Sequence, residues 1–554
     1  MSIESSAPLA VKIAHARDLD GRPRSDRLLP YLSVGQLLEL RAAETPDKVW
    51  MIWYDQDGAR GELTYSAFLQ RVHSRVRVLL DAGIRPSDRV ATYSGNYPET
   101  VLTYFACWYL GATVVPLSVS EDDPHLRFII QNSGVKVVFT RPEFVDGIER
   151  VLTGCEPKID IQRRVEPVEV IDDADDPFEL FPCEKPEQEA LIVYTSGTTG
   201  NPKGVLLDHY NLLVDGWALA NHHHITPDSR MMCVLPVHHV NGTIVTLVTP
   251  LVAGSSVVLN ERFSVKNFFP RLAAEQVEVV SVVPTLLAFL LEANASTAGL
   301  NLKVHHIICG AGPLTVDLAM RFEERYGIPI AHGYGLSETT CYSCCLPVDQ
   351  DPVEYKKWMS AHGYPSIGPA LPVNEMAIHD SDGLPLLAGE RGEIVIRGHN
   401  VMIEYFANES ANESAFRFGW FRSGDEGFWL PGPNGEPYFF ITGRIKELII
   451  RGGVNIAPLE IDEVLMAIPG VKAGISVGFP HDLYGEEVGA YVQLQDEADL
   501  TAEEIIKMCS AKLPYQKIPK VVLFGNQMPV TSTGKYQRNK LKPLFKEFQN
   551  VRFK

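Results

Sequence analysis

Between residues 30 and 330, stretches in which hydrophobic positions recur with a helical period alternate with short runs of β-branched residues. Segments with a helical period, at 66–82 and 98–110, are followed by short β-branched runs at 89–93 and 113–117. Similar short runs recur at 135–140, 278–283 and 305–309. Strands that alternate with helices predict an α/β fold with largely parallel sheets covered by helices.

The pattern changes after about residue 365. Hairpin-like runs appear, such as 392–397, and they are separated by turn-rich stretches such as 431–437. A β-rich portion is therefore expected to follow the α/β body. Because 554 residues exceed what one hydrophobic core usually holds, we expect more than one domain, with a boundary near 443–447.

Composition excludes several classes of protein. A formal net charge of -19 argues against a general nucleic-acid binder. The most apolar runs, 101–117 and 243–259, are interrupted by Gly and Pro, so no integral membrane segment is expected. Nine cysteines without regular spacing indicate reduced thiols in the cytoplasm. The tail 511–554 carries ten Lys and Arg against Glu547 alone, which fits either a solvated basic face or a site for a phosphorylated partner.

A loop after the apolar run 191–193 carries the first candidate chemistry. Its sequence is Tyr194-Thr-Ser-Gly-Thr-Thr-Gly-Asn-Pro-Lys203-Gly. Backbone N–H groups, hydroxyls and one cation suit several phosphate oxygens at once. A Walker loop is excluded because Pro202 stands five residues after Gly197 and Lys203 precedes Gly204. By composition alone the loop could equally be an ordinary connection.

Two further segments offer carboxylates. Gly333-Tyr-Gly-Leu-Ser-Glu338 follows a strand-like run at 328–332, so Tyr334 and Glu338 are expected in a turn beyond the strand's carboxyl end. Tyr334 could stack on adenine, and Glu338 could bind Mg²⁺. Asp425 follows Gly424 and could accept hydrogen bonds from ribose hydroxyls. Each could instead be a plain loop or turn residue. Gly310-Ala-Gly312 lacks the third glycine of a dinucleotide fingerprint, because Thr315 stands in its place.

Two further strings follow: Gly443-Arg-Ile-Lys446, with Gly452-Gly453 after it, and Thr533-Gly-Lys535. Taken in order from residue 194 to 541, all these strings resemble the signatures of the adenylate-forming superfamily, and of its acyl-CoA synthetases and AMP-dependent ligases in particular. The resemblance implies a large N-terminal domain, 1–442, built of two packed α/β sheets plus a β-rich portion. It also implies a hinge at 443–447 and a small mobile α+β domain at 448–554. The implied reaction joins a carboxylic acid to AMP with release of pyrophosphate, and then transfers the acyl group to coenzyme A, using ATP and Mg²⁺.

The resemblance also assigns roles to residues. Lys535, Glu338, Thr195 and Lys203 would act in catalysis, with Glu338 holding Mg²⁺, and Lys446 would be the hinge. An ammonium such as that of Lys535 can relieve repulsion between the carboxylate and the α-phosphate. Nucleotide contacts are implied for Thr195, Ser196, Gly197, Thr198, Thr199, Gly200, Lys203, Gly310, Ala311, Gly312, Gly333, Tyr334, Gly335, Ser337, Glu338, Asp425, Arg444 and Lys535. The acyl and CoA tunnel is implied at His239, Val282, Gly310, Gly312, Gly452 and Gly453.

Alternatives to this function remain at the level of sequence. A ligase that loads a separate carrier protein would share the same signatures. A free amino acid is disfavoured as substrate, because His238-His239-Val-Asn241 lacks the Asp that usually holds an ammonium in peptide-synthetase domains. A non-catalytic adenylate-binding regulator would have little use for both Glu338 and Lys535. The acid itself cannot be read from the sequence.

Histidines and cysteines outside these strings predict no metal site. Cys341, Cys344 and Cys345 contain one C-x-x-C spacing without a second pair, so we interpret them as pocket or core residues. His222–His224 are expected at the surface.

Overall fold

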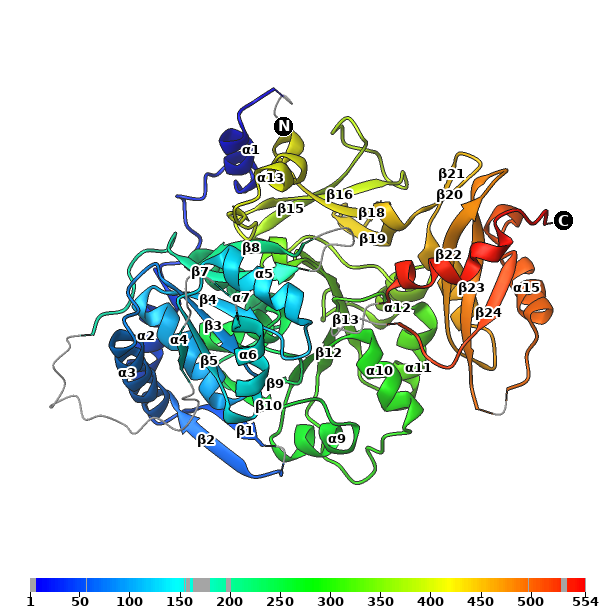
Figure 1. Ribbon diagram of the computed structural model, residues 1–554. Helices are drawn as coiled ribbons and strands as arrows, with labels where there is room; N and C mark the ends of the chain where they lie inside the picture. Colours follow the sequence, from blue (N-terminus) through cyan, green and yellow to red (C-terminus); the bar gives the residue numbers. More distant parts are fainter. Residues whose placement is uncertain are drawn as a thin grey trace.

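The computed structural model describes residues 6–55, 57–153, 155, 160–162, 180–195, 201–496, 498–529 and 536–553 (Figure 1). Four β-sheets organise these residues. The first two are α/β sheets, the third is antiparallel, and the fourth lies in a separate C-terminal part (Figure 1).

The eight-stranded sheet has the order β14-β13-β12-β11-β9-β10-β1-β2. Its inner strands pair in parallel, while β2 and β14 close the two edges as antiparallel strands. The bounds are β1 Val49–Tyr54, β2 Arg60–Thr64, β9 Arg230–Cys233, β10 Ser256–Asn260, β11 Val279–Val282, β12 His306–Cys309, β13 Ile330–Tyr334 and β14 Cys344–Cys345.

The seven-stranded sheet has the order β17-β8-β7-β4-β3-β5-β6 and is parallel from β7 to β6. Strands β8 and β17 continue it in antiparallel pairing. The bounds are β3 Arg89–Tyr93, β4 Thr113–Leu117, β5 Val137–Thr140, β6 Asp160–Gln162, β7 Glu189–Thr195, β8 Lys203–Asp208 and β17 Glu404–Tyr405.

The helices of this part of the chain are α1 Leu9–Ala16, α2 Val34–Glu44, α3 Tyr65–Asp81, α4 Pro98–Leu110, α5 Asp123–Ser133, α6 Val145–Leu152, α7 His209–His222, α8 Thr249–Ala253, α9 Val265–Ala274, α10 Pro284–Glu292, α11 Val316–Tyr326, α12 Pro352–Ser360 and α13 Glu409–Ala415. They pack on the two α/β sheets and between them, except α1 and α13, which lie beside the third sheet (Figure 1). A π-helix, η3, spans Asn241–Val248. Short 3₁₀ turns are η1 Pro142–Phe144, η4 Ser337–Thr339, η5 Arg417–Gly419, η6 Ile445–Glu447, η7 Tyr515–Lys517, η8 Arg538–Lys540 and η9 Lys542–Phe548.

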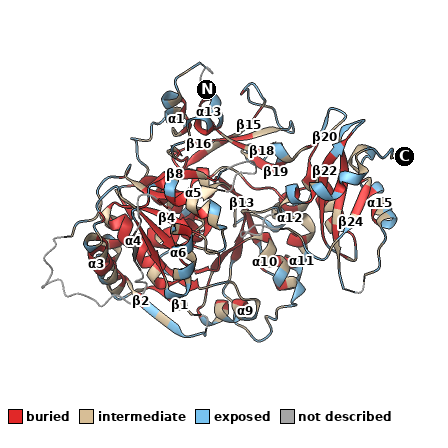
Figure 2. Cartoon of the chain, in the orientation of Figure 1, coloured by how far each residue is buried: buried red, intermediate tan, exposed pale blue. Residues whose placement is uncertain are grey.

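The main core lies where α4 and α7 are enclosed (Figure 2). Nearly every residue of α4 is buried, which explains its lack of a polar face. Aromatic rings fill the neighbouring space: Trp50 lies 4.3 Å from Phe68 and 5.2 Å from Phe105, between ring centroids. Burying such large side chains is a main source of stability for the body of the fold.

The third sheet has the order β15-β16-β18-β19, with antiparallel neighbours throughout. Its strands are β15 Asn374–His379, β16 Gly392–Gly398, β18 Phe421–Pro431 and β19 Pro437–Arg444. The chain leaves this sheet at Arg444, passes through η6 and enters the fourth sheet at Ile449. The expected β-rich portion after the α/β body is therefore present.

The fourth sheet has the order β21-β20-β23-β22, and β24 pairs with β23. Its elements are β20 Ile449–Arg451, β21 Val454–Ile456, α14 Pro458–Met466, β22 Val471–His481, β23 Gly485–Leu494, α15 Ala502–Ser510 and β24 Val521–Phe524. Its buried apolar residues form clusters of their own, as expected for a separate domain. The predicted fold class, a multi-sheet α/β body with a small α+β C-terminal domain, is confirmed.

Within the described part of the chain, none of the helices combines the length and the hydrophobicity that a membrane crossing requires.

Candidate active site

Residues from three sheets converge near the carboxyl end of β13. Tyr334 is the last residue of β13, and Glu338 lies in η4 directly after it. Asp425 and Arg444 are paired across β18 and β19 of the third sheet. Lys203 opens β8 in the second α/β sheet. The sequence predicted Tyr334 in a turn beyond its strand. This prediction was wrong, because Tyr334 is the last residue of the strand and still pairs with Cys344 of β14.

Asp425 is the best-anchored carboxylate of the group and is only 1% exposed. The hydroxyl of Tyr334 donates to its Oδ2 at 2.5 Å, and Nε of Arg444 lies 2.8 Å from its Oδ1. Burial, followed by the charge of Asp425, raises the pKa of Tyr334 well above its ordinary value, and the same charge raises the pKa of Arg444. Tyr334 therefore remains a neutral donor, and the carboxylate is held in place as an acceptor for further hydroxyl groups.

Glu338 lies beside a second tyrosine, Tyr405 of β17. The Tyr405 hydroxyl donates to Oε1 of Glu338 at 2.7 Å, and Nζ of Lys203 lies 4.6 Å from the centre of the Tyr405 ring. Among the described residues, Tyr405 is the only donor to the carboxylate of Glu338, and it occupies one of the two carboxylate oxygens. A hard cation such as Mg²⁺ prefers such oxygens, so Glu338 fits the predicted metal role.

Lys203 has an unusual electrostatic setting. Burial lowers the pKa of Lys203, the charge of Glu338 opposes this shift, and the charge of Lys446 adds to it. Lys446 in η6 is thus close enough to influence the site. Lys203 and Lys446 thus bring two ammonium groups to this edge, and such cations can contact a polyphosphate. Carboxylates lie there too, because Asp425, Glu338 and Glu447 all act on Arg444.

The backbone after Glu338 is held in a strained turn. Thr340 has φ 65° and ψ −57°, and the N–H of Cys341 donates to the carbonyl of Thr339 at 2.7 Å, which defines a γ-turn. The Thr340 hydroxyl donates to the carbonyl of Asn400 at 2.6 Å. Strain of this kind persists only where surrounding contacts impose it, and it is common at functional sites.

The predicted glycines allow close approach of Tyr342. A Cβ at Gly310 would lie 2.5 Å from the Tyr342 hydroxyl, and one at Gly333 would lie 2.6 Å from its ring. A Cβ at Gly335 would lie 1.9 Å from the Cys341 carbonyl. These three positions therefore require glycine. Between the glycines of the Gly310–Gly312 turn, Ala311 adopts φ 60°, a left-handed conformation.

The segment around His239 lies against the same tyrosine. His239 is half-buried and precedes η3, whose first residue, Asn241, donates to the Tyr342 hydroxyl at 3.3 Å. Asn241 also accepts from the hydroxyl of Ser281 at 2.7 Å, next to the buried Val282 at the end of β11. A π-helix directly after a candidate pocket residue is a frequent feature of functional sites.

Some predicted residues lie elsewhere or cannot be placed. Gly452 and Gly453 are exposed at the turn between β20 and β21, and the structure does not bring them to the end of β13 (Figure 1). Ser337 begins η4, and the Thr195 hydroxyl lies 3.5 Å from the carbonyl oxygen of Lys203. Ser196, Gly197, Thr198, Thr199, Gly200 and Lys535 lie outside the described residues.

Sequence reasoning missed Tyr405 and Tyr342. Neither stands in a recognisable string, and each is joined to the site by contacts that close only in three dimensions. One other expectation was wrong: His223 is only 3% exposed, and His222 is half-buried, although a surface position was expected. The end of β14 accounts for this, because Cys345 contacts His223 and the carbonyl of the next residue, Leu346, contacts His222.

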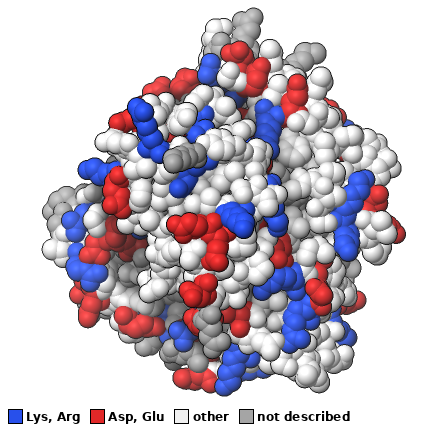
Figure 3. Space-filling model, turned by 90° about the vertical axis from the view of Figure 1, so that its right-hand side faces the viewer, with Lys and Arg blue, Asp and Glu red and all other residues white. Residues whose placement is uncertain are grey.

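Among the described residues of the basic tail, ion pairs interrupt the positive charge. Lys517 pairs with Glu460, Arg538 with Asp462, and Lys542 with Glu486, all within the C-terminal domain. The right-hand face of the molecule accordingly shows basic and acidic side chains intermixed (Figure 3). These contacts favour the solvated basic face over a dedicated site for a phosphorylated partner.

Comparison with known proteins gives consistent matches over nearly the whole chain. A family model described as AMP-binding enzyme matches residues 38–406, and one described as AMP-binding enzyme C-terminal domain matches residues 460–535. A sulfoacetate–CoA ligase from Cupriavidus necator is 33% identical over 515 residues, covering 92% of this chain and 97% of the relative. A feruloyl-CoA synthase from an Amycolatopsis species is 31% identical, covering 87% and 94%.

Solved structures agree with these matches. ATP-bound MatB from Rhodopseudomonas palustris superposes with a TM-score of 0.83 at 26% identity, covering 93% of this chain and 100% of the other. The o-succinylbenzoate CoA synthetase from Bacillus subtilis, in complex with its acyl-adenylate intermediate, gives a TM-score of 0.79 at 29% identity, covering 91% and 97%.

Proposed function

The chain belongs to the family of AMP-binding enzymes, and on this premise we propose how its own residues act as an acid–thiol ligase. It activates a small carboxylic acid with ATP and Mg²⁺ and transfers the acyl group to coenzyme A. The observation that supports the site assignment is the convergence of Asp425, Glu338 and Lys203 around the carboxyl end of β13. One anchored carboxylate, one cation ligand and one ammonium are the groups that a magnesium nucleotide needs.

In this proposal the nucleotide lies across the end of β13. Asp425 accepts hydrogen bonds from the ribose hydroxyls, and Arg444 stays beside it as the counter-charge. The ring of Tyr334 lies against adenine, next to the Gly310–Gly312 turn. Glu338 binds Mg²⁺, and Lys203 contacts the phosphates together with the loop 195–200.

The first half-reaction is an in-line displacement. A carboxylate oxygen of the acid attacks the α-phosphorus of ATP, the bond to the β-phosphate oxygen breaks, and pyrophosphate leaves. We assign to Lys535 the charge that lets two anions approach. In the second half-reaction the thiol sulfur of coenzyme A attacks the acyl carbonyl carbon, and AMP leaves as the thioester forms.

The two half-reactions require two arrangements of the domains. We place the boundary at 443–447, with an N-terminal domain 1–442 and a C-terminal domain 448–554. The passage of the chain from β19 to β20 through η6 supports this division. Because Gly452 and Gly453 are exposed and apart from β13, a rotation about Lys446 is needed before they can border the pantetheine arm.

The acyl pocket is proposed between His239, Val282 and the Gly310–Gly312 turn, with Tyr342 as a further wall. The acids after which three relatives are named, sulfoacetate, ferulate and oxalate, differ widely in size and charge. The identity of the acid must therefore come from a screen. We also place the protein in the cytoplasm, which is supported by nine cysteines that are all free thiols.

The test is a screen of carboxylic acids that measures pyrophosphate and AMP release, each with and without coenzyme A. We expect at least one acid to give pyrophosphate in both conditions and sustained AMP release only with coenzyme A. Lys535→Ala should lose pyrophosphate release yet still form thioester from supplied acyl-adenylate.

Two outcomes would overturn the proposal. Sustained AMP turnover that does not depend on coenzyme A would favour loading of a carrier protein. No activity with any acid, in a preparation that still binds ATP, would favour a non-catalytic adenylate-binding regulator. Equal loss of both half-reactions in Lys535→Ala would contradict the role given to that lysine.

A further inference from the structure

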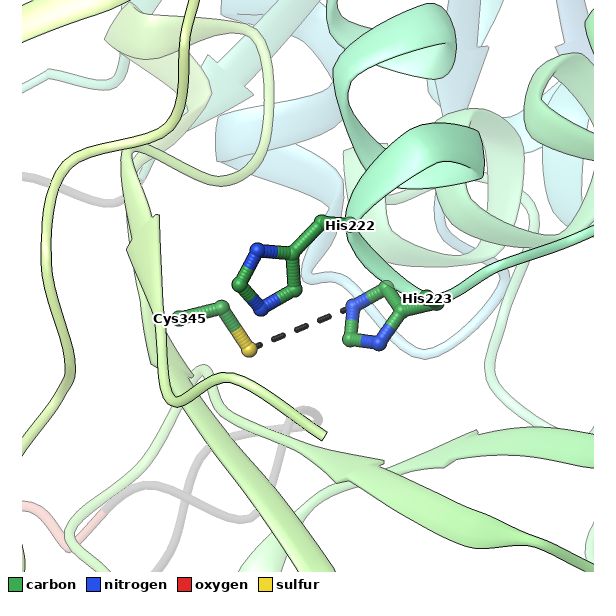
Figure 4. A group of neighbouring side chains, drawn as sticks. All are labelled: His222, His223 and Cys345. Atoms are coloured by element: carbon green, nitrogen blue, oxygen red, sulfur yellow. Dashed lines mark hydrogen bonds between the residues drawn. The ribbon is translucent and has the colours of Figure 1, made fainter. Parts of the chain in front are cut away.

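A cluster of histidine and cysteine side chains lies outside the proposed adenylate site. His222 is the last residue of α7, His223 is the next residue, and Cys345 ends β14 (Figure 4). One potential ligand atom from each residue lies within 4.8 Å of the other two. The three side chains point toward a common centre, although they come from elements more than a hundred residues apart (Figure 4).

The spacing of two of these atoms matches a shared ion. Nε2 of His223 lies 3.9 Å from Sγ of Cys345. With metal–sulfur and metal–nitrogen bonds of about 2.3 and 2.0–2.1 Å, a nitrogen and a sulfur bound to one ion are about 3.5–3.6 Å apart at a tetrahedral angle and about 3.7–3.8 Å apart at a trigonal one. The two side chains would therefore need to move only slightly to bind one ion. Because both residues are buried, water does not compete freely for the ion.

His306 supplies the support that a metal-binding histidine usually has. Its Nε2 lies 3.0 Å from Nδ1 of His223, and the two rings are stacked with centroids 5.0 Å apart. When Nδ1–H of His223 donates to His306, Nε2 of His223 presents its lone pair to the centre.

His222 can be the third ligand once its ring proton moves from Nε2 to Nδ1. Its Nε2 lies 3.0 Å from the carbonyl oxygen of Leu346, so Nε2 carries the proton and donates in this structure. On ligation that proton moves to Nδ1, and the Cys345 thiol releases its proton to solvent as the thiolate binds.

We propose that His222, His223 and Cys345 bind one thiophilic transition-metal ion, zinc(II) or copper(I), with His306 orienting His223. A thiolate with two imidazoles suits both ions and disfavours Mg²⁺ or Ca²⁺. Cys345 pairs with Gly333 across β13, so the ion links the end of α7 to the strand beside Tyr334. The proposal does not depend on the catalytic assignment, because binding of the ion is measured directly.

The experiment uses the full-length protein after removal of metals with a chelator. Zinc(II), and copper(I) under anaerobic reducing conditions, are each titrated against a competing chromophoric chelator. We expect one equivalent of at least one ion to bind, and cobalt(II) to give a thiolate-to-metal charge-transfer absorption. Cys345→Ser should lose that absorption and the stoichiometric binding, while His306→Gln should weaken binding about 10–100-fold.

Two controls test the specificity of these changes. His224→Gln removes the neighbouring histidine, whose side chain is 62% exposed, and Cys509→Ser removes a buried thiol of the other domain. Both should bind metal as the wild type does. Neither ion binding stoichiometrically, or Cys345→Ser binding with wild-type affinity, would overturn the proposal. If Cys345→Ser does not fold, the cobalt spectrum of the wild type decides, and absence of the thiolate band is the negative result.

Discussion

Asp425 lies at the centre of the proposed nucleotide site, because it accepts from Tyr334 and pairs with Arg444. Asp425→Asn keeps the shape but removes the charge that strengthens hydrogen bonds to ribose. A hydrogen bond to a charged group contributes about 1.5–3 kcal/mol, so kcat/KM for ATP should fall about 10–100-fold. Steady-state kinetics with the acid held saturating measures this fall.

A nucleotide that lacks the ribose hydroxyls tests whether Asp425 contacts them. 2′,3′-Dideoxy-ATP should be a poor substrate for the wild type, while Asp425→Asn should show little further loss with it. Asp382→Asn, a change at an exposed aspartate, serves as the matched control. Equal penalties for the dideoxy nucleotide in both proteins would remove Asp425 from ribose recognition.

At the residue scale, the sequence could predict groups that stand in compact strings, such as Glu338 and Asp425. It could not predict Tyr405, because the hydrogen bond to Glu338 joins residues 67 positions apart. It misplaced His223 for a related reason. A run of three histidines is polar in sequence, and only the packing of β14 against α7 makes the second one a core residue.

At the scale of elements, the alternating pattern predicted several bounds closely. The expected runs at 89–93 and 113–117 coincide with β3 and β4, and the expected helix at 98–110 coincides with α4. Apolar runs of this length, bounded by turn signals, define such elements locally. The antiparallel pairing of β7 with β8 was not expected from the sequence. The two-residue strand β14 is too short to show a pattern of its own and is defined only by its pairing with β13.

Helix α7 carries a buried acid that gives the fold a pH dependence. Asp215 is fully buried and accepts from the amide of Asn400 at 3.2 Å, and burial raises its pKa from 3.8 to about 8. The folded protein thus binds this proton more tightly than the unfolded chain. The free energy of unfolding should therefore fall as pH rises from about 4 to about 8, by roughly 2–3 kcal/mol between pH 6 and pH 8.

Asp215→Asn removes the titrating group and keeps an acceptor for Asn400. Thermal or denaturant unfolding at pH 6 and pH 9 should then show a smaller loss of stability at pH 9 than the wild type shows. Asp57→Asn, at an exposed position, should keep the wild-type difference. The assignment is wrong if Asp215→Asn loses as much stability as the wild type over this range.

At the scale of the whole molecule, the small domain is docked on the large one through α14. Glu463 accepts from the backbone N–H of Val316, the first residue of α11, at 3.1 and 3.2 Å. Nearby, Glu460 accepts from the hydroxyl of Tyr364, and Lys472 pairs with Glu292. These polar contacts are joined by Leu459, which packs against the core of the large domain. An interface with so many polar contacts is compatible with the domain rotation that we propose.

The docked arrangement should itself respond to pH through Glu463. Burial raises the pKa of Glu463 to about 8 from an ordinary value of 4.5, although the Val316 N–H opposes this shift. Because the docked form holds the proton more tightly than an undocked form, docking is favoured at low pH and weakens as pH rises through about 8. Energy transfer between dyes on the two domains should therefore decrease from pH 6 to pH 9.

Glu463→Gln, which keeps an acceptor without a charge, should abolish that decrease, whereas Glu503→Gln on the exposed face of α15 should not. A decrease of the same size in Glu463→Gln would mean that another group controls the docking.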